Sequence, residues 1–132
     1  MAYASALLGD PAGTYRRIDV AGRTATADAP GLVQLLYEEL VAALRAAAWA
    51  CEHGRHAHKS DRVQRATAIL FALDAGLDFD GGGEVSRTLA RLYAGARATM
   101  VKAAIGSDPA PFRDTADSLE EIAAAWRQAR AA

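Results

Sequence analysis

Residues 32–51 read LVQLLYEELVAALRAAAWAC, and this stretch decides the fold class of the chain. Apolar residues recur in it every three or four positions, which is the spacing of one face of an α-helix. An acidic capping residue and a proline precede the stretch at Asp28 and Pro30, and Gly54 follows it. These are start and stop signals, so we expect one long helix from about residue 28 to residue 53.

The same pattern returns three more times along the chain. A second apolar stripe begins after Ser60 or Asp61, a third runs over about 84–105, and a fourth follows Asp108 and Pro109. Polar or glycine-rich segments separate the stripes, at 53–59, 78–83 and 106–109. Because these connections are short, neighbouring helices must pack antiparallel. Residues 28–132 are therefore predicted to form an all-α, up-down-up-down four-helix bundle.

Residues 1–27 differ from the rest of the chain. They hold glycines and a proline with scattered apolar residues, and no helical stripe persists among them. We predict an irregular, flexible N-terminal arm.

Composition limits the function. The chain has 132 residues, of which 33 are alanine, the best helix former, and its net charge is −1. A balanced charge does not favour nucleic acid as a partner. No segment has the roughly 18 uncharged residues of a membrane span. One cysteine and the lack of a signal peptide predict a cytoplasmic protein.

Two segments contain residue types that could bind a metal ion or a phosphate group. Cys51, His53, His56 and His58 place four potential metal ligands close together, but their spacing lacks the longer loop of structural zinc sites. The segment DFDGGGE at 78–84 resembles neither a phosphate loop nor a calcium loop, since its carboxylates repel phosphate and Glu84 comes too early for calcium. We interpret both segments as interhelical turns. No metal, no cofactor and no enzymatic activity is predicted.

Several segments, read in order, resemble the FliS family of flagellar secretion chaperones. TADAPGLVQLLYE at 26–38 is similar to the family's first-helix entry. AILFALDAGLD at 68–78, GGE at 82–84 and LARLY at 89–93 match the family in residue type and spacing, and AW at 125–126 matches its last helix. The resemblance covers nearly the whole chain.

Three positions depart from the family pattern. Pro30 lies one position later than the family's proline, Gly95 replaces an aromatic residue, and Ala104 stands where the family usually has asparagine. Gly95 either permits a close approach of two helices or enlarges a groove, and of the two we favour the close approach.

The resemblance implies a non-enzymatic chaperone that binds the disordered C-terminal segment of flagellin, prevents its premature polymerisation and assists its secretion. A contact with the flagellar export apparatus is implied as well. The flagellin-binding residues expected on this basis are Tyr15, Ile18, Ile69, Leu73, Leu77, Leu89, Leu92 and Tyr93. We expect the arm around Tyr15 and Ile18 to cover an apolar groove until the client displaces it. The alternatives are a helical-bundle regulatory adaptor for another protein, and a small metal-binding protein that uses the turn at 51–58.

Overall fold

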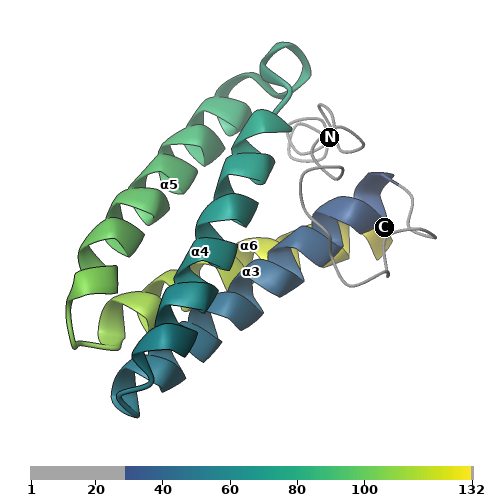
Figure 1. Ribbon diagram of the computed structural model, residues 1–132. Coiled ribbons are helices and arrows are strands. Elements are labelled where there is room, and N and C mark those ends of the chain that lie inside the picture. Colours follow the sequence, from purple (N-terminus) through teal and green to yellow (C-terminus); the bar gives the residue numbers. More distant parts are fainter. Residues whose placement is uncertain (1–28, 132) are drawn as a thin grey trace.

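The computed structural model describes residues 29–131, which form four helices joined by short turns (Figure 1). Their bounds are α3, Ala29–Glu52; α4, His56–Ala75; α5, Phe79–Ile105; and α6, Ala110–Ala131. No strand occurs within this range. The predicted all-α four-helix bundle is thus confirmed. The predicted arm, 1–27, lies outside the described residues.

The four helices are arranged as two crossing pairs. In Figure 1, α4 and α5 run side by side in opposite directions, while α3 and α6 lie together beneath them. Helix α3 packs extensively against both α4 and α6, whereas α5 packs mainly against α4 and touches α6 only sparsely. One long side of α5 is therefore loosely covered.

Large and small side chains share the core of the bundle. Trp126, Tyr37, Tyr93 and Phe112 are its largest fully buried residues, and alanines fill the narrow spaces between helices. The alanines from α3 in this core are Ala43, Ala47 and Ala48. Because an alanine adds little bulk, the axes of α3 and its neighbours can approach closely, and leucines at the remaining positions supply most of the buried apolar area.

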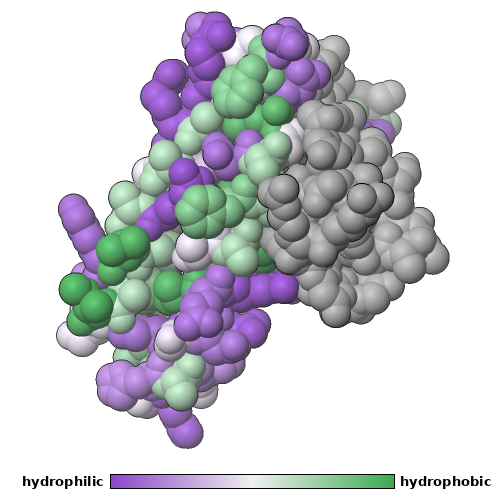
Figure 2. All heavy atoms as spheres, turned by 45° about the horizontal axis from the view of Figure 1, so that its top comes forward, coloured by the Kyte–Doolittle hydropathy of each residue, from purple (hydrophilic) through white to green (hydrophobic). Residues whose placement is uncertain are grey.

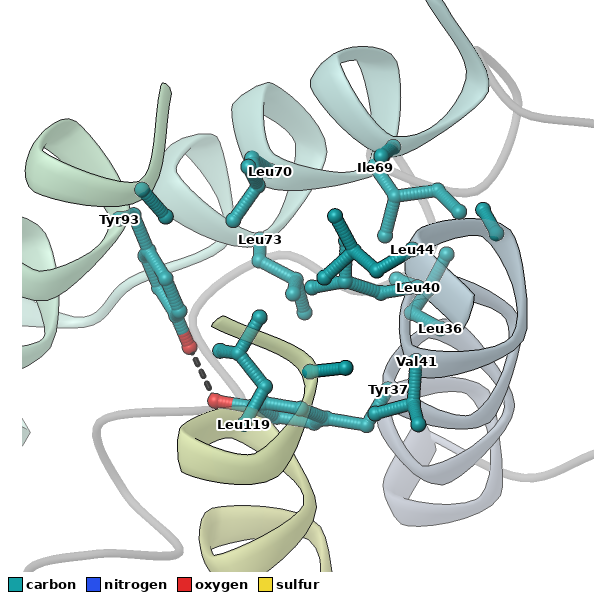
Figure 3. Packing of buried hydrophobic residues seen from close by; sticks show 14 of the residues in the cluster. Leu36, Tyr37, Leu40, Val41, Leu44, Ile69, Leu70, Leu73, Tyr93 and Leu119 are labelled. Carbon is teal, nitrogen blue, oxygen red and sulfur yellow. Dashed lines mark hydrogen bonds between the residues drawn. The ribbon is translucent and has the colours of Figure 1, made fainter. Parts of the chain in front are cut away.

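One hydrogen bond ties α3 to α5 across this core. The hydroxyl groups of Tyr37 and Tyr93 bond to each other, as the dashed line in Figure 3 shows. Both side chains are completely buried, so this contact lets two phenol groups leave water with a partner. It fixes the position of α5 relative to α3 at the level of Leu73 and Leu119 (Figure 3).

Two predicted helix boundaries are corrected by the structure. Helix α4 begins at His56, four residues before Ser60, so His56 and His58 lie on a helix and only 53–55 form the turn. The predicted break at 78–83 is partly helical: α5 begins at Phe79, and the chain bends at Gly83, whose φ is +52°. Such a φ suits glycine because a side chain would be strained there.

Lys59 explains the early start of α4. Its side chain is buried, at 8% exposed, and its Nζ donates a hydrogen bond of 2.9 Å to the carbonyl oxygen of Gly106 at the end of α5. A cation at a helix C-terminus interacts favourably with the unpaired carbonyls there. The first turn of α4 is therefore anchored by tertiary contacts that a sequence pattern does not reveal.

We predict that Lys59→Met lowers the free energy of unfolding by about 1 kcal/mol, because it removes this charged hydrogen bond while keeping most of the buried chain length. Urea denaturation followed by circular dichroism measures the change. Gln64, an exposed polar residue of the same helix, provides the control, since Gln64→Met should leave the unfolding midpoint nearly unchanged. An equal effect of both variants would contradict the anchoring role of Lys59.

Candidate functional site: a groove between α5 and α6

The sparse contact between α5 and α6 leaves an open groove on the surface. Its volume is about 300 Å³. Leu92, Ala96 and Leu119 provide apolar side chains to its lining, and its other residues are Arg91, Gly95, Thr99, Thr115 and Ser118. We call this hollow the α5–α6 groove. An apolar floor with a few polar groups is typical of a surface that binds a peptide segment.

The hollow continues along α5 toward its C-terminal end. A second pocket of about 230 Å³ shares Thr99 with the α5–α6 groove and is lined further by Lys102, Ala103, Gly106, Asp108 and Pro111. The two together follow one side of α5 over four turns. This length suits an extended or helical segment better than a small molecule.

Gly95 enlarges the groove, so the favoured prediction of close helix packing at this position is wrong. Among residues 29–131, a Cβ atom built on Gly95 would have no heavy atom within 4 Å beyond its two chain neighbours and the nearby backbone of its own helix. None of the described helices approaches it closely, and α6 is only sparsely packed against α5. Because Gly95 has no side chain, an open space remains there and lines the groove.

The structure separates the predicted flagellin-binding residues into three groups. Tyr15 and Ile18 lie outside the described residues. Leu92 is partly buried and lines the α5–α6 groove. The others are buried in the core, where Figure 3 shows three of them; they are Ile69, Leu73, Leu77, Leu89 and Tyr93. A client in the groove would contact Leu92 directly, with the buried residues supporting the helices from within.

Sequence reasoning missed the polar side of the groove. Thr99, Thr115 and Ser118 come from two helices and meet only because α5 and α6 lie beside each other. Thr115 and Ser118 share a face of α6 through their spacing of three, but no spacing in the sequence links either of them to Thr99. The one available signal is the glycine at position 95 within a helical pattern, which predicts close packing, whereas the structure shows an open groove there.

The histidine-rich segment takes part in an aromatic contact. The ring of Trp49 stacks on that of His53 with a centroid distance of 4.2 Å, and His58 meets the Trp49 ring edge-on at 6.3 Å. His53 Nδ1 lies 2.7 Å from the Trp49 carbonyl oxygen. Among residues 29–131, no three His, Cys, Asp or Glu side chains are grouped so that they could hold a metal ion.

The glycine-rich segment forms the N-terminal cap of α5. Asp78 Oδ1 accepts a hydrogen bond of 2.9 Å from the Gly81 backbone N–H, and Ser86 Oγ donates to the Asp78 carbonyl oxygen at 2.6 Å. Glu84 is exposed and pairs with Arg87 one turn later. The hydrogen bond from Arg87 and its charge lower the pKa of the Glu84 carboxyl from the ordinary value of 4.5. The carboxylates of Asp78 and Glu84 therefore both have partners within the chain.

The molecule described so far is an all-α helical bundle with an open groove on its surface. Within 29–131, no helix is both long and apolar enough to cross a membrane.

Comparison with known proteins identifies the family. The family model described as flagellar protein FliS matches residues 11–132, so this chain belongs to the FliS family. It is 28% identical to the flagellar secretion chaperone FliS of Salmonella typhimurium over 115 residues, covering 86% of this chain and 85% of the relative. The corresponding chaperone of Vibrio cholerae is 25% identical, with coverage of 86% and 84%. FliSB of Pseudomonas aeruginosa, a flagellar secretion chaperone, is 27% identical, with 85% and 89% covered.

We predict that Gly95→Ala raises the free energy of unfolding by about 0.5–1 kcal/mol, because alanine favours the helix and its methyl group meets no obstacle. Thermal and urea denaturation measure the gain. Gly83→Ala is the matched comparison and should destabilise, since Gly83 has a positive φ. A loss of stability in Gly95→Ala would contradict the open surroundings of this position.

We predict that Arg87→Gln raises the pKa of Glu84 back toward 4.5, because the hydrogen bond and the charge that lower it are lost. A carbon-13 NMR titration of the side-chain carboxyl measures both values. A depressed folded-state pKa means that the pair stabilises the wild type above the ordinary carboxyl pKa and stops doing so as the pH falls through the lowered value. An unchanged Glu84 titration in Arg87→Gln would refute the pairing.

Proposed function

We propose that this chain is a flagellar secretion chaperone that binds the disordered C-terminal segment of a flagellin, keeps it from polymerising and assists its delivery to the export apparatus. Membership of the FliS family over residues 11–132 carries this proposal. Its relatives in Salmonella typhimurium and Vibrio cholerae are named flagellar secretion chaperones, and the alignments span more than four fifths of each protein.

The α5–α6 groove is the surface that suits such a client. A segment that is disordered alone can fold into an amphipathic helix on a partner and place its apolar side chains at helical spacing into a groove. Leu92, Ala96 and Leu119 supply an apolar lining, and the missing side chain of Gly95 leaves room for a large client residue. Thr99, Thr115 and Ser118 can hydrogen-bond to backbone or polar groups at the edges.

In this proposal, the predicted binding residues within the described part of the chain have two roles: direct contact with the client and support of the helices that form the groove. Leu92 contacts the client directly, while Ile69, Leu73, Leu77, Leu89 and Tyr93 hold α4 and α5 in the geometry that shapes the groove. Tyr15 and Ile18 belong to the arm that we propose is displaced by the client. No bond is made or broken in this function. The chaperone holds its client by burying apolar surface, and the cost of ordering the client keeps the affinity moderate and release possible.

Titration calorimetry with the C-terminal segment of the flagellin from the same organism tests the function. We expect saturable one-to-one binding to the full chain, with a negative heat-capacity change from the burial of apolar surface. Gly95→Leu should weaken binding by at least about tenfold, because its side chain fills the groove before the client arrives. Circular dichroism verifies that the variant is folded.

Ala42→Leu is the matched control, since it places the same leucine side chain at an exposed position of α3. Normal binding by both variants would show that the client does not bind in the α5–α6 groove, while leaving the chaperone role intact. A folded wild-type chain that fails to bind the segment at all would contradict the proposed function and favour a regulatory adaptor for another partner.

A further inference from the structure

Helix α5 carries a second apolar stripe on the side opposite its buried face. Ala94, Ala98, Val101 and Ile105 are all exposed, although their neighbours Tyr93, Ala96, Met100 and Ala103 are buried. Val101 is 72% exposed and Ile105 is 91% exposed, the highest values among the large apolar residues of the described chain. A helix that is apolar on two opposite sides usually packs on both of them.

Helix α4 extends this stripe into a patch. Phe71 is 57% exposed and lies beside α5, where the guanidinium of Arg97 stands 4.5 Å above the centre of its ring. Ala68 and Ala75, one turn to either side of Phe71, are exposed as well. Figure 2 shows hydrophobic side chains gathered over α4 and α5. We call this surface, made by Phe71, Ala94, Ala98, Val101 and Ile105, the outer face.

The spacing on the outer face is that of a coiled-coil seam. Positions 94, 98, 101 and 105 are separated by four, three and four residues, which are the intervals between the d and a positions of a heptad repeat. A flat arrangement of this kind is filled by a second helix running along α5, whose side chains enter the spaces between these residues. The occupant is therefore a helix rather than an extended strand.

The charges beside the seam decide which helix can bind. In the same heptad frame, Arg97 and Lys102 occupy the flanking g and e positions, and Lys102 also borders the pocket that continues the α5–α6 groove. Residues 85–105 contain four basic side chains and no acidic one. Two copies of this chain paired along α5 would set these cations against each other in either orientation. A helix with carboxylates at its own flanking positions would pair with them instead.

Arg97 is already held in place for such a contact. Its stacking on Phe71 restricts the side chain, and its Nη1 atom is buried without a hydrogen-bond partner. A guanidinium fixed in this way loses little conformational freedom when its remaining nitrogens bind a carboxylate. The outer face thus combines an apolar seam with a preorganised cation.

We propose that the outer face binds an acidic amphipathic helix of a second protein, at a site separate from the α5–α6 groove. The groove residues Leu92, Gly95 and Thr99 face α6, whereas the outer face lies on the α4 side of α5 and the side turned to solvent. The apolar residues of the two surfaces do not overlap. The proposal does not depend on which client the groove takes.

A designed helical peptide of about three heptads, with leucines at its a and d positions and glutamates at e and g, is the probe. The same peptide with lysines in place of the glutamates is its matched control. Fluorescence anisotropy against the full chain should show saturable binding of the acidic peptide and at least about tenfold weaker binding of the basic one. Binding of the acidic peptide should weaken steeply as salt is added.

Three variants locate the contact. Ile105→Asp should weaken binding of the acidic peptide by at least about tenfold, because it places a charge in the apolar seam. Arg97→Gln should weaken binding by a smaller factor, because it removes the cation beside the seam. Ala125→Asp, at an exposed position of α6, should leave it unchanged. Since residue 105 is almost fully exposed, the variant remains folded, and its binding of the flagellin segment should equal that of the wild type.

Equal affinity for the acidic and basic peptides would overturn the proposal, as would unchanged peptide binding by Ile105→Asp. If Ile105→Asp lost binding of the flagellin segment while Gly95→Leu kept it, the outer face would be the client's binding surface, and the proposal would again be overturned. Sedimentation velocity, which measures the oligomeric state, provides the last test. A wild-type dimer that Ile105→Asp converts to a monomer would show that a second copy of this chain covers the outer face, which would also overturn the proposal.

Discussion

The close packing of α3 against α4 and α6 is the contact on which the rest of the structure depends. Leu40, Leu44 and Ala47 on α3 are completely buried, and the alanines beside them allow neighbouring helix axes to come near. Since an alanine buries little area, this packing needs leucines and aromatics at the remaining core positions to contribute most of the apolar stabilisation. The Tyr37–Tyr93 hydrogen bond extends the same core to α5.

Helix α5 packs less extensively against its neighbours than α3 does, and for that reason more of its surface remains accessible. It packs against α4 but only sparsely against α6, and the space left between them is the α5–α6 groove. Its solvent side keeps Val101 and Ile105 uncovered. Relatives of this chain are named secretion chaperones, and α5 is the helix that leaves large apolar side chains exposed on a folded surface.

Most of the fold could be predicted from the sequence because each helix carries its own periodic pattern and stop signal. The stripe at 32–51 became α3, and the signals at Asp108 and Pro109 preceded α6. The sequence pattern predicts too late a start for α4 because the buried contact of Lys59 with Gly106 joins residues 47 positions apart. The candidate site was only partly predictable: Leu92 lies in the groove, whereas five other chosen residues are core, since one apolar pattern serves both purposes.

The sequence by itself determined the fold class, the order of the helices and the family, because local periodicity, capping residues and the spacing of short motifs are all written along the chain. Only the tertiary structure decided which apolar residues remain at the surface. Gly95 shows the difference: its effect depends on how far α6 stands from it, and that distance is set by the packing of α3 with α4 and α6 rather than by any residue near position 95.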